Sequence, residues 1–441
     1  MSNIESTCVM TSPNHACFFF CRFGKQARDK ARWTRTTVNV EDHIIIPTLD
    51  PSAVLMDSEK VVEDYVASLS ALPMHRSRPL WDFHLLDLPT SEAASTIVFR
   101  VHHSIGDGMS LMALLMTSTR VVADSPNTRT ARPTRTGAIY DRPRPQLSAG
   151  ALAFAAWVWS YFLLAWNTMV DLGFVLATIL FLNDPHTMFK RANDDEFHCK
   201  RFVHRNLSLD EVKLIKNVMN CSVNDVLVGL TSAALSRYYF RNSRDHNNTK
   251  ICLRSILPVN MMPATSLQKY VNVIESDKKD DVIWGNQLGY IILPFHLTKH
   301  HDPLAYVRRA KKVLDRKKRS LEVIITYMIA NIFMKAFGVK AGALMFRRGF
   351  AHTSMVFSNM VGPAEQVELF GHPVAFVAPS VFGIPEALIV HYQSYRRTIK
   401  VILSLDEDKF PDYRHLLDDF AQSLVAMKDA ASRLSTSTKT D

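Results

Sequence analysis

The chain has 441 residues, of which 47% are hydrophobic and 21% charged, and its formal net charge is +10. This length and composition exclude a disordered chain and a single small core, so we expect two domains. The positive charge suits nucleic acid, an anionic membrane surface or an anionic substrate, but the sequence contains no zinc finger or RNP-type segment, which makes nucleic acid the least favoured partner.

The N-terminal segment does not have the form of a signal peptide. Its apolar core, residues 16–21, is too short, and charged residues follow at once. The six cysteines show neither a metal-ligand spacing nor the disulfide framework of a secreted domain, which favours a reducing compartment.

Three elements are expected before the first motif. Residues 36–48 alternate apolar and polar side chains up to Pro47, which is typical of a strand or an extended arm. Apolar residues at helical spacing predict a helix over residues 58–72. Residues 81–86, which follow Pro79, predict a strand.

A paired-histidine motif, residues 102–108 (HHSIGDG), stands between an apolar run and a helical pattern. If strand alternation continues into the pair, His103 shares a face with the apolar run and His102 lies on the other face. A histidine in apolar surroundings at a strand end can deprotonate an alcohol, so His103 is a candidate base. We expect Asp107 to hold the loop through an orienting ion pair, and Gly108 to permit close backbone approach. The alternatives are a satisfied core histidine and a helix N-cap.

The middle of the chain contains a linker and a long apolar segment. Residues 124–148 are rich in proline and arginine, which marks a linker and a domain boundary. Residues 149–182 contain a single charge, Asp171, and their first part is long enough to span a bilayer core of about 30 Å. The arginines upstream would place that side in the cytoplasm. The alternative is a buried or interfacial helical hairpin, since Asn167 and Asp171 would interrupt a second span.

Strands and helices alternate through the second half of the chain. A capping box beginning at Ser208 predicts a helix through Met219, and Ser222 opens a second helix. Further helices are expected over residues 304–319, 321–346 and 413–432, and strands over residues 251–259, 285–294 (ended by Pro294), 355–359, 375–378, 387–392 and 399–403. This pattern predicts an α/β (α+β) protein with two lobes of similar size.

Several motifs in a fixed order resemble the plant branch of the wax ester synthase/diacylglycerol acyltransferase family, within the CoA-dependent acyltransferase superfamily. The resemblance covers nearly the whole chain from Trp33. Its motifs are Trp33 to His43, Pro79-Leu80-Trp81, His102 to Gly108, Asn224-Asp225, Gly285-Asn286 and Ser358 to Pro363. The plant O-hydroxycinnamoyl-type acyltransferases match less well, because their DFGWG motif is absent.

The resemblance implies a two-lobed, chloramphenicol-acetyltransferase-like fold with a central channel. We expect an N-terminal lobe over residues 1–148, an apolar crossover segment over residues 149–200 and a C-terminal lobe over residues 201–441. The first lobe is expected to be truncated, because Met1 to Arg32 matches little of the longer N-terminal segment typical of the family. A missing edge strand would weaken that lobe.

The resemblance also implies roles for single residues. His103 would be the proton acceptor, with His102 beside it, and Asp107 and Gly108 would be structural. The acyl acceptor would lie near Pro79, Leu80 and Trp81. Asn224, Asp225, Ser358 and Asn359 would lie near the channel, where Asn359 would hydrogen-bond a substrate or intermediate.

The implied reaction is transfer of a fatty acyl group from acyl-CoA to a long-chain alcohol, and also to diacylglycerol, without a metal or cofactor. A basic group, Arg308, Arg309, Lys311 and Lys312, either binds the CoA phosphates or is a solvated helix face. Residues 149–182 would hold the enzyme at the endoplasmic reticulum membrane, or at the plasma membrane, with the catalytic part in the cytosol. The alternative function is a degenerate paralogue that binds lipid or a partner at the membrane.

Overall fold

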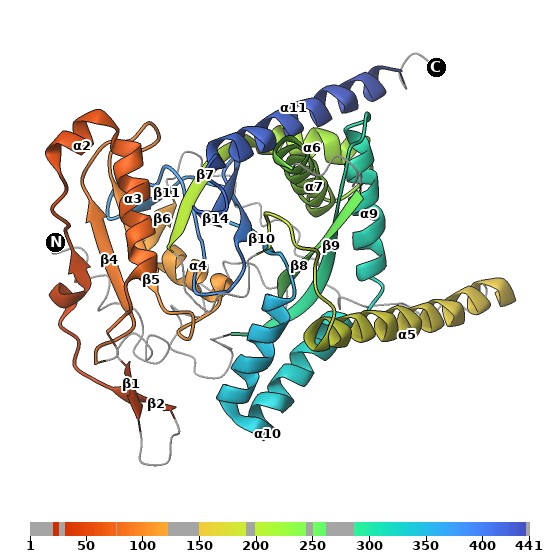
Figure 1. Cartoon of the computed structure of the whole chain (residues 1–441), viewed down its shortest axis with the longest axis horizontal. Coiled ribbons are helices and arrows are strands. Elements are labelled where there is room, and N and C mark those ends of the chain that lie inside the picture. Colours follow the sequence, from red (N-terminus) through yellow and green to blue (C-terminus); the bar gives the residue numbers. More distant parts are fainter. Residues whose placement is uncertain are drawn as a thin grey trace.

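The computed structural model describes residues 21–25, 31–75, 77–121, 150–190, 199–243, 250–261 and 286–437. They form two lobes, with the N-terminal lobe on the left in Figure 1 and the C-terminal lobe in the centre and on the right. The predicted linker at residues 124–148 and Gly285 lie outside the described residues.

The N-terminal lobe is built on a three-stranded sheet in the order β3-β4-β5. The predicted helix at residues 58–72 and strand at residues 81–86 are confirmed as α3 and β4, whereas only two residues of the predicted strand at 36–48 form one. The elements are β1 (Cys21–Lys25), β2 (Ala31–Arg35), η2 (Val40–His43), β3 (Ile44–Ile45), α2 (Pro51–Met56), α3 (Ser58–Ala71), β4 (Trp81–Leu86), β5 (Thr96–Val101), α4 (Gly108–Thr117) and β6 (Thr119–Val121).

The C-terminal lobe is built on a six-stranded sheet in the order β7-β14-β13-β10-β8-β9. Strand β10 runs parallel to β8 and β13, and the other neighbours are antiparallel. The elements are α5 (Gly150–Leu180), β7 (Lys200–Ser208), α6 (Leu209–Val218), α7 (Val223–Asn242), β8 (Lys250–Asn260), β9 (Leu288–Thr298), α9 (Leu304–Lys317), α10 (Glu322–Ala351), β10 (Met355–Val361), β11 (Val367–Leu369), β12 (His372–Pro373), β13 (Leu388–Tyr395), β14 (Thr398–Asp406) and α11 (Tyr413–Ser437).

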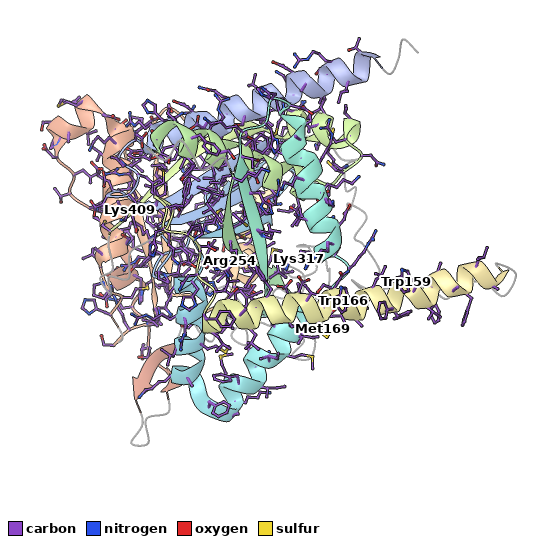
Figure 2. All side chains as sticks on the ribbon, turned by 45° about the vertical axis from the view of Figure 1, so that its right-hand side comes forward. Trp159, Trp166, Met169, Arg254, Lys317 and Lys409 are labelled. Atoms are coloured by element: carbon purple, nitrogen blue, oxygen red, sulfur yellow. The ribbon has the colours of Figure 1, made fainter. Side chains whose placement is uncertain are left out.

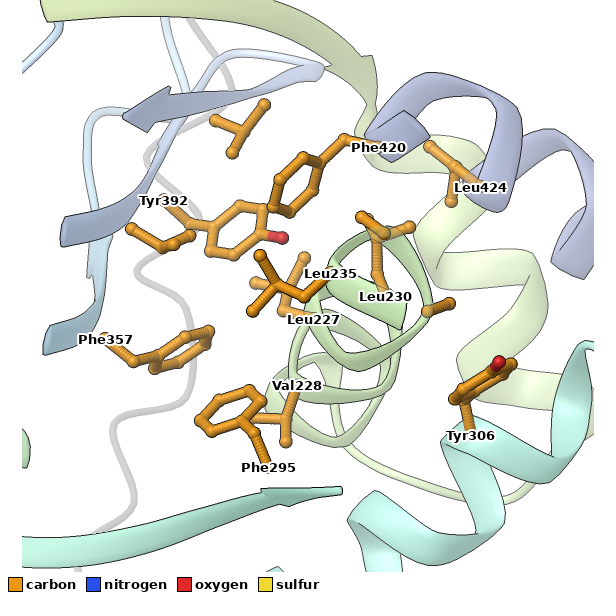
Figure 3. Packing of buried hydrophobic residues seen from close by; sticks show 14 of the residues in the cluster. Leu227, Val228, Leu230, Leu235, Phe295, Tyr306, Phe357, Tyr392, Phe420 and Leu424 are labelled. Carbon is orange, nitrogen blue, oxygen red and sulfur yellow. The ribbon is translucent and has the colours of Figure 1, made fainter. Parts of the chain in front are cut away.

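Strand alternation gives the large sheet two different faces. On one face, Phe357 of β10 and Tyr392 of β13 pack against α7 and α11 in the largest buried apolar cluster, seen in Figure 3. Alternate residues of the same strands, among them Ser358, Met360 and His391, lie on the opposite face. We call this second face the inner face, because Met360 abuts Gly108 of the N-terminal lobe. The lobes are also joined where β6 pairs with β11.

Two predicted strands need correction. Residues 375–378 form no strand; instead, Phe376 packs over Lys400 on the inner face, so this short apolar run is a packed irregular segment. Pro294 does not end its strand but lies inside β9, opposite Arg254. Proline is tolerated there because β9 is the edge strand and needs no donor on its free side.

Helix α5 is one continuous helix of 31 residues, so the hairpin alternative is wrong. Its start extends into open space, with Trp159 and Trp166 exposed along it (Figure 2). Its second half is fixed to the C-terminal lobe, since buried Asp171 pairs with Lys317 at 3.0 Å and with Arg316. Among the described residues, α5 alone is long and apolar enough to cross a membrane as an unbroken helix; two bent helix pairs also meet the criterion if each counts as one span.

Candidate active site

The paired histidines lie in a turn directly after β5. The backbone N–H of His102 donates to the carbonyl of Leu80 at 2.9 Å, and the chain then turns so that the N–H of Ile105 donates to the carbonyl of His102 at 2.9 Å. Strand alternation therefore stops at Val101. The prediction that His103 faces an apolar interior is wrong, because both histidine side chains are exposed.

The two histidine rings differ in their partners. Nδ1 of His102 lies 2.6 Å from the Ser104 hydroxyl and accepts the Ser104 backbone N–H at 3.2 Å. The His103 ring has no hydrogen-bond partner among the residues that the structure describes. An accessible, unoccupied imidazole can take a proton from a hydroxyl group that comes within reach, whereas the His102 ring is already oriented by Ser104.

Both lobes hold the loop that carries His103. From the C-terminal lobe, the Asn286 side-chain amide donates to the carbonyl of His103 at 2.8 Å. The Gln287 backbone N–H points to a carboxylate oxygen of Asp107 at 3.4 Å. The other Asp107 oxygen accepts the Ser110 N–H at 2.9 Å, which makes Asp107 the N-cap of α4. No ion pair joins Asp107 to a described residue, so the expected ion pair is replaced by a cap.

Gly108 lies at a close contact between the lobes. A Cβ atom at this position would lie 2.9 Å from the sulfur of Met360, closer than side chains normally approach. The expected close approach is therefore confirmed, and the neighbour is the inner face of the C-terminal sheet.

Replacing Asp107 by alanine should destabilise the protein by about 1–2 kcal/mol, because the first turn of α4 loses its cap. The activity should fall as well, since the His103 loop loses one of its two ties to the C-terminal lobe. Thermal unfolding, followed alongside ester formation, measures both effects. Asp107→Asn is the matched control, because asparagine caps a helix about as well as aspartate. Equal losses in both variants would contradict the capping role.

The Pro79-Leu80-Trp81 motif lies beneath the same loop. Leu80 and Trp81 are both 4% exposed and pack with Ile105 of the loop in one apolar cluster. His43 stacks on the Trp81 ring with centroids 4.1 Å apart. Burial gives these residues a packing role under the His103 loop, and contact with the acyl acceptor stays a prediction.

The two asparagine motifs of the C-terminal lobe meet. The Asn359 side-chain amide donates to the Asn224 side-chain oxygen at 2.6 Å, which joins the end of β10 to the start of α7. Buried Asp225 closes a capping box with Ser222, so its role at this site is structural. Ser358 lies on the inner face in register with His391 of β13.

The basic group on α9 lies elsewhere. Helix α9 packs on α7, on the face of the sheet opposite to the one that abuts Gly108. Within the group, Arg308 pairs with Asp302 at 2.6 Å and Lys311 donates to the carbonyl of Asn220 at 2.6 Å. Two members of the group are thus already paired within the chain, which favours the solvated-face alternative.

Sequence reasoning did not identify the roles of Asn286 and Gln287. Both precede a strand that is distant in sequence from the histidine motif, and their contacts depend on how the lobes meet. The available signal was the Gly285-Asn286 motif of the family resemblance, to which no role was attached.

Family models match most of the chain. The model described as wax ester synthase/diacylglycerol acyltransferase catalytic domain matches residues 28–227, and the model described as WS/DGAT C-terminal domain matches residues 284–428.

Relatives and solved structures agree with these matches. Two Arabidopsis thaliana proteins, wax ester synthase/diacylglycerol acyltransferase 11 and 5, are 39% and 38% identical over 91% of this chain and 83% and 82% of theirs. A wax ester synthase/diacylglycerol acyltransferase from Marinobacter aquaeolei VT8 shares the fold with a TM-score of 0.59 at 17% identity, covering 94% of this chain and 86% of that one. The epimerization domain of tyrocidine synthetase B has a TM-score of 0.52 at 10% identity, over 98% and 89%. The chain belongs to the wax ester synthase/diacylglycerol acyltransferase family.

Proposed function

We propose that this protein transfers a fatty acyl group from acyl-CoA to the hydroxyl of a long-chain alcohol or of diacylglycerol, with His103 as the general base. The observation that carries the assignment is the exposed His103 ring, without a partner among the described residues, on a loop that both lobes hold. The family name supports the substrate classes.

In the proposed reaction, His103 takes the proton from the alcohol as its oxygen attacks the thioester carbonyl. The tetrahedral oxyanion collapses, the carbon–sulfur bond breaks, and the imidazolium returns the proton to the departing thiolate, so an ester and free CoA leave. The protein forms no covalent intermediate, and acyl-CoA is a substrate rather than a cofactor. The oxyanion needs hydrogen-bond donors, and the Asn359 amide, held by Asn224, is the proposed one.

The proposed substrates are lipids, and α5 supports contact with a membrane. Large apolar side chains along it are exposed, among them Trp159 at 58% and Phe162 at 55%. The kinked helix α10, which bends at Gly338, packs against α5 and adds exposed apolar residues such as Ile332 and Phe337. We place the protein at the endoplasmic reticulum membrane, with the plasma membrane as the alternative and the catalytic lobes in the cytosol.

Changing Trp159 and Phe162 together to arginine should release the protein from membranes washed with carbonate. Each arginine placed in the bilayer core costs about 2.5–3.5 kcal/mol on an insertion scale, and neither side chain is buried in the protein. The control changes Leu55 and Met56 of α2, which are 89% and 88% exposed, to arginine. Retention of the α5 variant would contradict the proposed membrane contact.

Expression tests the activity itself. In a host that makes no neutral lipid, cells fed a long-chain alcohol should accumulate wax esters when they express this chain. Acyl-CoA binding by the purified protein without ester formation would contradict the proposal and favour a lipid-binding paralogue.

A further inference from the structure

The inner face of the C-terminal sheet carries buried polar atoms without partners. Among the described residues, both ring nitrogens of His391, the side-chain oxygen of Gln393 and the hydroxyl of Ser404 have no hydrogen-bond partner. His391 is 7% exposed, and Gln393 and Ser404 are fully buried. A buried polar group without a partner costs about 1–3 kcal/mol, so three together on one face point to a ligand.

Strand register gathers these residues into one cluster. His391 is the centre of it: Gln393 lies two residues further along the same face of β13, and Ser404 of β14, which pairs with Ile389, is diagonal to His391 on its other side. We call these three residues the inner-face cluster.

The cluster lies next to the loop that carries His103. Gln393 is in register with Met360 of the neighbouring strand, and the sulfur of Met360 abuts Gly108 of the histidine motif. Neighbouring strands are about 4.8 Å apart, so Met360 lies between Gln393, at one end of the cluster, and the start of α4.

The chemistry of the cluster matches an uncharged group that both donates and accepts a hydrogen bond. Burial lowers the pKa of His391 to about 4, so its ring is neutral near pH 7 and offers one donor and one acceptor. Ser404 adds a donor, and the Gln393 oxygen adds an acceptor. The nearest cation on this face, Lys400, forms an ion pair with Glu92 at 2.5 Å. Lys400 is therefore not free to bind a phosphate group, and the cluster does not favour an anionic ligand.

A secondary amide has this combination of donor and acceptor. A long-chain alcohol has only its reacting hydroxyl, and the esters of diacylglycerol only accept hydrogen bonds. The pantetheine arm of an acyl-CoA contains two secondary amides, both close to the thioester. We propose that the inner-face cluster binds a pantetheine amide of the acyl donor and thereby sets the thioester beside His103. This inference rests on the proposed use of acyl-CoA.

The cluster is closed to solvent in this structure. The irregular segment 374–387 packs over the same face, with Phe376 on Lys400 at one end and Ile384 beside Ile389 at the other. The pantetheine arm would therefore reach His391 by displacing part of this segment.

Thioesters of one acyl chain that differ only in the thiol test the assignment. We would compare acyl-CoA, the N-acetylcysteamine thioester with its single amide, and the ethyl thioester with none, each with the same alcohol. His391→Leu should lower kcat/KM about tenfold for acyl-CoA, as expected for loss of one or two hydrogen bonds, and should leave the ethyl thioester unchanged. His391→Gln, which restores a donor and an acceptor, should recover part of the loss. The N-acetylcysteamine thioester should follow acyl-CoA if the amide nearest the sulfur is bound, and the ethyl thioester if the farther one is.

The other outcomes separate the possible failures. An equal loss on all donors would mean that His391 only supports the fold, and a loss confined to diacylglycerol as acceptor would assign the cluster to the acceptor; either result overturns the proposal. Inactivity of the unmodified protein with every donor would instead contradict the acyltransferase function.

Discussion

Replacing His103 by alanine should reduce ester formation by about 10²–10⁴-fold, the usual contribution of a positioned general base. The expectation follows from the geometry: the ring is exposed and has no partner among the described residues, and the Asn286 side-chain amide holds the backbone carbonyl of the same residue. Folding should be almost unaffected, because no described contact of the ring is lost. The measurement is the rate of ester formation from acyl-CoA and a long-chain alcohol by purified protein.

Two other histidine variants serve as controls for His103. His415→Ala removes an exposed ring on α11 and should leave the rate unchanged. His102→Ala removes the ring that Ser104 orients, and its loss should be smaller than that of His103→Ala. A His103→Ala protein that retains substantial activity would contradict the assigned role.

Changing Asp184 to alanine should destabilise the C-terminal lobe by about 3–5 kcal/mol, because it leaves a buried guanidinium without its charge partner. Asp184 and Arg254 are 4% and 3% exposed and lie 2.5 Å apart. Arg254 also donates to Thr178 at the end of α5 and to the carbonyl of His352 after α10. The pair therefore fixes both apolar helices to β8. Denaturant unfolding measures the loss.

The matched control is Asp302→Ala. Its ion pair with Arg308 is solvent-exposed and contributes at most about 1 kcal/mol. Its carboxylate also accepts the Leu304 N–H at the start of α9, a cap worth about 1 kcal/mol, so the total loss should stay at or below about 2 kcal/mol. Similar destabilisation in the two variants would contradict the structural role of the buried pair.

The sequence predicts elements well where one local signal decides them. Ser208 and Glu211 predict a helix start on residue type and spacing alone, and Ser208 caps α6 in the structure. Residues 81–86 likewise combine strand periodicity with a preceding Pro79. Local signals of this kind give the two lobes and most of their helices.

The surroundings of the histidines could not be predicted in the same way. Strand alternation assumes that the strand continues, but the hydrogen bond from His102 to Leu80 is the last before the turn, and His103 is exposed as a result. The hydrogen bonds from Asn286 to the His103 carbonyl and from the Gln287 N–H to Asp107 depend on how the two lobes pack together. The sequence shows that His391 and Gln393 are polar residues within an apolar strand. Whether their side chains have hydrogen-bond partners depends on the three-dimensional packing around them.

The most direct test of the acyltransferase assignment follows CoA release and ester formation together in purified protein. The assignment predicts that CoA appears only when a long-chain alcohol or diacylglycerol is present, and in equal amount to the ester formed. Ester without free CoA, CoA release that does not depend on an acceptor, or bound acyl-CoA that is never turned over would each contradict it.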